Sequence, residues 1–223
     1  MTPAEKTQAS GSEFEVSSQE QSGQYVDKRS KTFDAIQVAL SSLSLLCGLV
    51  VLGTSSSVAS VYSSTHLPIE LDLPLWPEDF DIRPTNALIA GGVLVAVVNF
   101  VALAFAKIQK LQKLQMAQRI VTFAAPSIGF LSVFVAVVLF YSVNASTTTD
   151  TVHSWSCQWD YTPMSTKPYF DSVCKESKTA LYLSIILIPV EAAALGLGLY
   201  RMLLERKALQ SNPASKSSSP SLA

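Results

Sequence analysis

One acidic residue, Glu191, lies near the middle of an apolar stretch that runs from Thr179 to Tyr200. A carboxylate at the centre of a bilayer costs about 2.5–3.5 kcal/mol on insertion scales, so it must face other helices and find a partner, or be protonated. Three further apolar stretches each contain one polar side chain at a similar depth, estimated from a helical rise of about 1.5 Å per residue. These side chains belong to Ser44, Asn99 and Ser132.

Two interpretations are open for this intramembrane polar cluster. Ionisable and polar groups inside a membrane can relay protons or ions, or bind a small polar ligand. The same groups can instead form interhelical hydrogen bonds that fix the bundle, at about 0.6–2 kcal/mol per bond. We favour the structural interpretation, because transporters usually contain repeats or broken helices and this chain has no internal repeat. In either case we expect Asn99 to be the nearest polar side chain to Glu191.

The elements that position these residues are four apolar stretches, each long enough to cross a hydrocarbon core roughly 30 Å thick. The chain has 223 residues, of which 48% are hydrophobic and 15% charged. We therefore predict an all-α membrane protein, a four-helix transmembrane bundle with a small disulfide-linked luminal cap that contains short β-strands. The predicted spans cover residues 35–55, 85–106, 120–143 and 179–200.

Polar tails and loops flank and connect the spans. The four-span domain extends over residues 35–203, and polar composition predicts disordered cytosolic tails at 1–34 and 204–223. We predict luminal loops at residues 56–84 and 144–178.

The turn at residues 107–119 determines the predicted orientation. It contains basic residues and no acidic residue, which is typical of a cytosolic segment. Its basic residues are also candidates for contact with anionic lipid head groups. They are Lys107, Lys110, Lys113 and Arg119.

The second luminal loop contains most of the remaining structural signals. Cys157 and Cys174 are expected to form a disulfide in the oxidising lumen. Asn144 begins an N-glycosylation sequon next to the membrane. Apolar and polar residues alternate over residues 153–161, which predicts a strand with one aromatic face. We expect this strand to pack against a second short strand at residues 69–73.

Several classes of function find no support in the sequence. No nucleophile–base pair or cluster of metal ligands is visible, so we predict no enzyme activity, no metal site and no cofactor. No basic surface interleaved with aromatic residues suggests nucleic acid as a partner. The expected partners are the lipid bilayer, other membrane proteins and further copies of the chain.

The layout resembles that of tetraspanin-like and MARVEL-like four-span proteins, which also have short cytosolic tails and a larger second luminal loop. The Cys-Cys-Gly motif of tetraspanins is absent from this loop. The stretch LPLWPEDFDIRPTNALIAGG is similar to four-span membrane proteins of filamentous fungi, a resemblance that implies the same fold and no particular activity.

The leading functional hypothesis is a membrane organiser or adaptor that acts through its helix faces and its luminal loop. The alternative is a small transporter or channel accessory subunit that uses Glu191 to handle protons or ions. We expect the protein in the plasma membrane or in an endomembrane of the secretory pathway, with both termini in the cytosol.

Overall fold

The computed structural model describes residues 10–65, 76–77, 79–108, 115–145, 149–161 and 166–210. The chain divides into two compact units, Met1–Ala39 and Leu40–Ala223. The first unit is helical from Ser10 onward. The second unit contains the bundle and the cap, and the contacts discussed below all lie within it.

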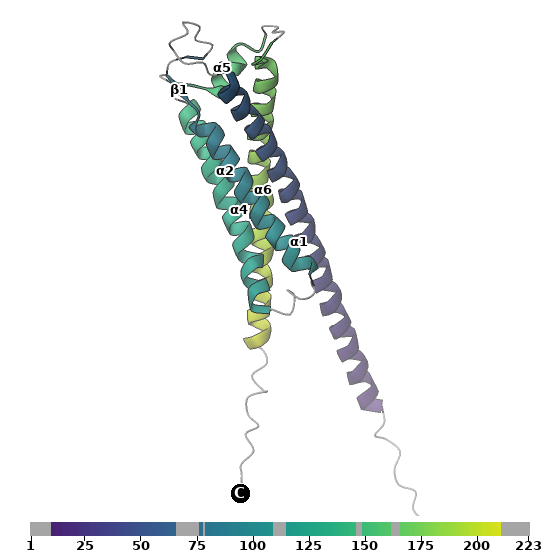
Figure 1. The fold of residues 1–223 in the computed structure, drawn as a ribbon. Coiled ribbons are helices and arrows are strands. Elements are labelled where there is room, and N and C mark those ends of the chain that lie inside the picture. The colour runs from purple at the N-terminus through teal and green to yellow at the C-terminus, as the bar shows by residue number, and fades with distance from the viewer. Residues whose placement is uncertain are drawn as a thin grey trace, which may run out of the picture. The chain divides into compact units, whose positions relative to one another are not determined.

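Four long helices, one short helix and two short strands make up the described elements. They are α1 (Ser10–Thr65), β1 (Phe80–Asp81), α2 (Arg83–Lys107), α4 (Gln115–Asn144), β2 (Asp150–Thr151), α5 (Val152–Gln158) and α6 (Phe170–Gln210). Each long helix contains a segment long and apolar enough to cross a membrane, so the predicted all-α, four-span fold is confirmed. In the second unit α5 and β1 lie together at one end of the bundle, which we call the capped end (Figure 1).

The helices are longer than the predicted spans. Residues 10–34, which we expected to be disordered, belong to α1, and α6 continues to Gln210 beyond the predicted start of the C-terminal tail. At the capped end α1 continues to Thr65 and α6 begins at Phe170, so both enter the predicted luminal loops. Threonine and serine hydroxyls in the last turns of α1 donate to carbonyl oxygens of the preceding turn, which lets polar residues remain helical beyond the apolar segment.

Glycine residues bring the backbones of α1, α2 and α4 close together. A Cβ atom at Gly92 would lie 3.1 Å from the backbone nitrogen of Leu52 in α1. A Cβ atom at the preceding Gly91 would lie 3.1 Å from Cβ of Ala136 in α4. Two successive glycines therefore let α2 pack closely against two different helices, α1 and α4. Such close approach stabilises helix packing in lipid.

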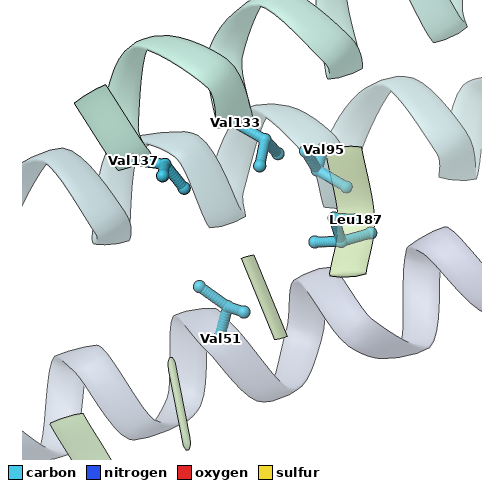
Figure 2. Packing of buried hydrophobic residues seen from close by; sticks show 5 residues of the cluster. All are labelled: Val51, Val95, Val133, Val137 and Leu187. Carbon is cyan, nitrogen blue, oxygen red and sulfur yellow. The ribbon is translucent and has the colours of Figure 1, made fainter. Parts of the chain in front are cut away.

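The centre of the bundle is filled by aliphatic side chains from all four long helices. We call this cluster the aliphatic layer, and Figure 2 shows its five side chains gathered between the helices. Its members are Val51, Val95, Val133, Val137 and Leu187. A second buried cluster lies nearer the capped end and includes Leu88, Phe140 and Leu181.

The cap has its own small core. A two-stranded parallel sheet pairs Phe80 with Asp150 and Asp81 with Thr151. The Phe80 ring of this sheet packs against Tyr62 and Trp76, and the Trp76 indole donates from Nε1 to Thr65 Oγ1 over 3.1 Å. The buried members of this core are Val58, Trp76, Val152, Phe170 and Val173. The helical extensions of α1 and α6 supply several of these residues, which explains why they stay helical beyond the membrane.

The predicted strand over residues 153–161 is wrong, because residues 152–158 form α5. Thr151 caps this helix, with its side chain accepting from the Ser154 backbone while the Ser154 side chain accepts from the Thr151 backbone. Such a capping box stabilises a helix start, and it outweighs the short alternation of apolar residues. The second predicted strand, at residues 69–73, lies outside the described residues, so the predicted pairing of the two is replaced by the β1–β2 pair.

Candidate functional site

Glu191 and Asn99 meet in the interior of the bundle. Asn99 Nδ2 on α2 donates to Glu191 Oε1 on α6 over 2.8 Å. Glu191 is 0% exposed and Asn99 is 2% exposed. The acid thus faces its neighbouring helices and not the lipid, and its nearest polar side chain is the one expected from the matched depths.

The orientation of the Asn99 amide follows from a second contact. Asn99 Nδ2 also donates to the Val95 backbone carbonyl over 3.0 Å. A carbonyl oxygen can only accept a hydrogen bond, so the amide nitrogen and not its oxygen must face Val95. Both hydrogens of the amide are therefore used, one to hold the amide on its own helix and one to bind Glu191.

Gly129 on α4 provides the surface against which the Glu191 carboxyl lies. A Cβ atom at Gly129 would be 2.8 Å from Glu191 Cδ and 2.9 Å from Oε2, closer than real Cβ atoms approach. Only glycine at this position leaves room for the carboxyl. This residue could not be predicted from the sequence, because a glycine contributes space and no functional group.

The predicted member from α4, Ser132, does not join the site. Its hydroxyl donates to the Ile128 carbonyl of its own helix over 2.7 Å. Ser132 lies three residues, or almost one turn, beyond Gly129 on α4, so its depth is similar but its direction differs.

Ser44 on α1 completes the site from the fourth helix. It is 1% exposed, and its hydroxyl lies close enough to the Glu191 carboxyl to interact with it, but outside the geometry of a regular hydrogen bond. Ser44 Oγ and Glu191 Oε2 are both buried and both lack a hydrogen-bond partner. Buried polar atoms normally have partners. Among the described residues Ser55 Oγ and Trp155 Nε1 are also without one, but Ser44 and Glu191 are neighbouring side chains inside the bundle. We call Glu191, Asn99, Gly129 and Ser44 together the carboxyl site.

The aliphatic layer closes the carboxyl site toward the capped end. Leu187 lies one turn before Glu191 on α6, and Val95 lies one turn before Asn99 on α2. Val133 follows Gly129 by one turn on α4, again on the capped side.

Within the described part of the chain no ion pair involves Glu191. No group of three or more His, Cys, Asp or Glu side chains there is placed to hold a metal ion.

The cap is braced by the predicted disulfide, which is confirmed. Cys157 on α5 is joined to Cys174 on α6, with Cα atoms 4.9 Å apart. Cys47 on α1 is a free, half-buried thiol. The disulfide ties the short helix α5, which could not persist alone in water, to the end of a membrane-spanning helix.

His153 is held between α5 and α6. Its Nδ1 lies 3.0 Å from Ser177 Oγ, and its ring packs edge-on against Phe140 with centroids 5.3 Å apart. Burial, and to a smaller extent the nearby Lys178 ammonium, lower the pKa of His153 below its ordinary value of 6.5. His153 is therefore neutral in the folded cap at neutral pH, a role that the sequence did not predict.

The side chain of Asn144 joins the end of α4 to the cap. Its Nδ2 donates to the Phe140 carbonyl over 2.9 Å, and its Oδ1 accepts from Thr151 Oγ1 over 2.6 Å. A glycan on Nδ2 would have to compete with this packing, and glycosylation of Asn144 stays a prediction.

The basic turn is only partly visible. Lys107 is exposed at the end of α2. Lys110 and Lys113 lie outside the described residues, as does the side chain of Arg119. Contact of these residues with anionic lipid head groups stays a prediction.

Comparison with known proteins identifies a family and nothing more specific. The family model described as a domain of unknown function (DUF8762) matches residues 3–217. No curated protein matches the chain, and no solved structure matches it.

The first prediction tests the role of Gly129. Gly129→Ala should lower the free energy of unfolding by about 1–3 kcal/mol, because the added methyl overlaps the Glu191 carboxyl. Gly196→Ala on α6 is the matched control, since a Cβ atom there meets nothing within 4 Å. Denaturant titration in mixed micelles measures both variants. Equal effects of the two substitutions would show that the carboxyl does not lie against Gly129.

The second prediction concerns His153 and pH. Because the folded pKa is lowered, the unfolded chain binds more protons than the folded one at acidic pH. Stability should therefore fall as pH drops through about 6.5 toward the folded pKa. His153→Gln, which keeps a hydrogen-bonding side chain but does not titrate, should remove most of this loss in thermal unfolding measured from pH about 7.5 to about 5.5. The control His66→Gln alters the only other histidine and should leave the loss intact; the reverse pattern would contradict the assignment.

Proposed function

We propose, for a chain that belongs to the family of the domain of unknown function DUF8762, a role as a non-enzymatic membrane organiser or adaptor. In this role the bundle anchors the protein in the bilayer and the cap presents a rigid surface to other membrane proteins.

The observation that carries the proposal is a group of exposed aromatic side chains on the cap. Trp159, Tyr161 and Tyr169 are 37%, 74% and 44% exposed. The Trp159 and Tyr161 rings stack with centroids 6.3 Å apart, and Trp159 also contacts Trp155, which packs against the cap core. Large aromatic residues on a rigid support are typical of the energetic centres of protein interfaces.

The outer faces of the helices offer a second kind of contact. Gly53 on α1 and Gly196 on α6 each have nothing within 4 Å of the position of an added Cβ atom. Small residues on exposed helix faces let another helix approach closely in lipid. Both faces are thus suited to helices of partner proteins or of a second copy.

The capped end is proposed to face the lumen or the outside of the cell. The Cys157–Cys174 disulfide lies at this end, and such bonds persist in oxidising compartments. The exposed Lys107 lies at the opposite end of α2, in agreement with a cytosolic location for basic residues. Both termini are then cytosolic, in the plasma membrane or in a membrane of the secretory pathway.

A second candidate function is a small transporter or channel accessory subunit that handles protons or ions at Glu191. The observation that favours it is the pair of partnerless buried atoms, Glu191 Oε2 and Ser44 Oγ. A purely structural hydrogen-bond cluster would be expected to satisfy both.

The third prediction tests the organiser role. Trp159→Ala combined with Tyr161→Ala should weaken partner binding about tenfold or more, as truncation of interface aromatics commonly does. Covalent capture in native membranes, followed by quantitative mass spectrometry of the captured proteins, measures this effect. Phe100→Ala is the control, because Phe100 is aromatic and 63% exposed but lies on the membrane-spanning part of α2, away from the glycine faces of α1 and α6. An unchanged set of captured proteins in the double variant would contradict the role of the cap.

A further inference from the structure

The carboxyl site contains one carboxyl oxygen that is satisfied and one that is not. Glu191 Oε1 accepts from Asn99 Nδ2, whereas Oε2 has no partner. Because Val95 fixes the Asn99 amide with its nitrogen toward the site, Oε1 faces a donor and has no need of a proton. Any proton on this carboxyl therefore belongs on Oε2.

The groups that face Glu191 supply no positive charge. They are the Ser44 hydroxyl from α1, the Asn99 amide from α2 and the Gly129 backbone from α4. The Cys47 thiol of α1 packs against the adjoining aliphatic layer, and a thiol supplies no positive charge. An ionised carboxylate without a cation in such surroundings is strongly disfavoured.

We propose that Glu191 Oε2 is a reversible proton-binding site inside the membrane, with Ser44 Oγ as the hydroxyl that faces the bound proton. Binding converts the carboxylate and a hydronium ion into the carboxylic acid and water, and release is the reverse. This inference deepens the second proposed function and rests on it for any role in transport.

The donor set fits a proton better than a metal ion. Divalent hard cations such as Ca²⁺ take six or more oxygen ligands, and Mg²⁺ takes six. In the described site only Glu191 Oε2 and Ser44 Oγ are free oxygen atoms, and Asn99 presents a nitrogen donor that would repel a cation. A single proton needs one acceptor and one facing hydroxyl, and the site offers both.

The proton is proposed to enter from the end of the bundle opposite the cap. Toward the capped end the site is bordered by the aliphatic layer, whose five side chains lie between the helices (Figure 2). In the other direction the buried neighbours about one turn away are small, namely Ser41, Ala125 and Ala194. These small side chains present less apolar bulk between the carboxyl site and the uncapped end than the valine and leucine side chains present on the other side.

Carbodiimide labelling of the intact protein in lipid vesicles tests the proposal. The hydrophobic reagent N,N′-dicyclohexylcarbodiimide reacts with protonated carboxyl groups in apolar surroundings, and mass spectrometry locates the adduct. Glu191 should be labelled, and each pH unit above its titration midpoint should lower the labelling rate about tenfold, between pH about 5 and about 10. Asp171, on the same helix but exposed and paired with Lys175, should react only with a water-soluble carbodiimide. In vesicles of one orientation, the rate should follow the pH on the uncapped side.

Each other outcome would overturn part or all of the proposal. Absence of an adduct at Glu191 in folded protein would show that the carboxyl does not bind a proton. A labelling rate independent of pH would show that the bound proton does not exchange reversibly. If sodium chloride, but not choline chloride of equal ionic strength, protects Glu191 from carbodiimide labelling, the site binds a metal cation and not a proton. A rate that follows the pH on the capped side would reverse the proposed route. If Glu191 is labelled as expected but the same vesicles show no Glu191-dependent proton flux, the proton-binding site is supported and only the transport function is refuted.

Discussion

The structure of the bundle depends on accommodating one buried carboxyl group. Glu191 is fully buried among apolar helices, where an unpaired acid would cost several kcal/mol. Three helices adapt to it: α2 supplies the Asn99 donor, α4 supplies the space at Gly129, and α1 brings the Ser44 hydroxyl beside it. The hydrogen bond and the glycine contact specify which faces of α2, α4 and α6 meet. Packing between aliphatic side chains alone would not specify these faces.

Packing around this site is organised in successive layers. The aliphatic layer lies next to the carboxyl site, a second apolar cluster follows, and the cap core closes the end. Close backbone contacts at Gly91 and Gly92 hold the helices at the separation that these layers require. In the cap, the disulfide and the aromatic core support a two-stranded sheet that would be marginal alone in water. The same support holds the exposed aromatic residues in place, which connects the rigidity of the cap with the proposed recognition of partners.

Much of this arrangement could be predicted from the sequence, and the exceptions have physical causes. Hydropathy located the four helices, and helical rise matched the depth of Asn99 to that of Glu191. Depth does not specify the direction of a side chain around its helix, so Ser132 was chosen where Gly129 forms the contact. The alternation around Trp155 suggested a strand, but the capping box at Thr151 and the attachment of Cys157 to α6 favour a helix. The capped ends of α1 and α6 extend beyond the predicted spans, to Thr65 and back to Phe170, because packing in the cap, and not hydrophobicity, keeps these residues helical.

A double-mutant cycle between Asn99 and Glu191 tests the central interaction most directly. Asn99→Leu and Glu191→Met remove the donor and the acceptor with little change in volume, and unfolding free energies are measured for both single variants, the double variant and the parent in bicelles. The account predicts a coupling of about 0.6–2 kcal/mol, the range found for interhelical hydrogen bonds in membranes. A parallel cycle between Ser132 and Glu191 should be additive within about 0.5 kcal/mol. Additivity of the Asn99 and Glu191 substitutions would contradict the account, because the two side chains would then not support each other in the folded bundle.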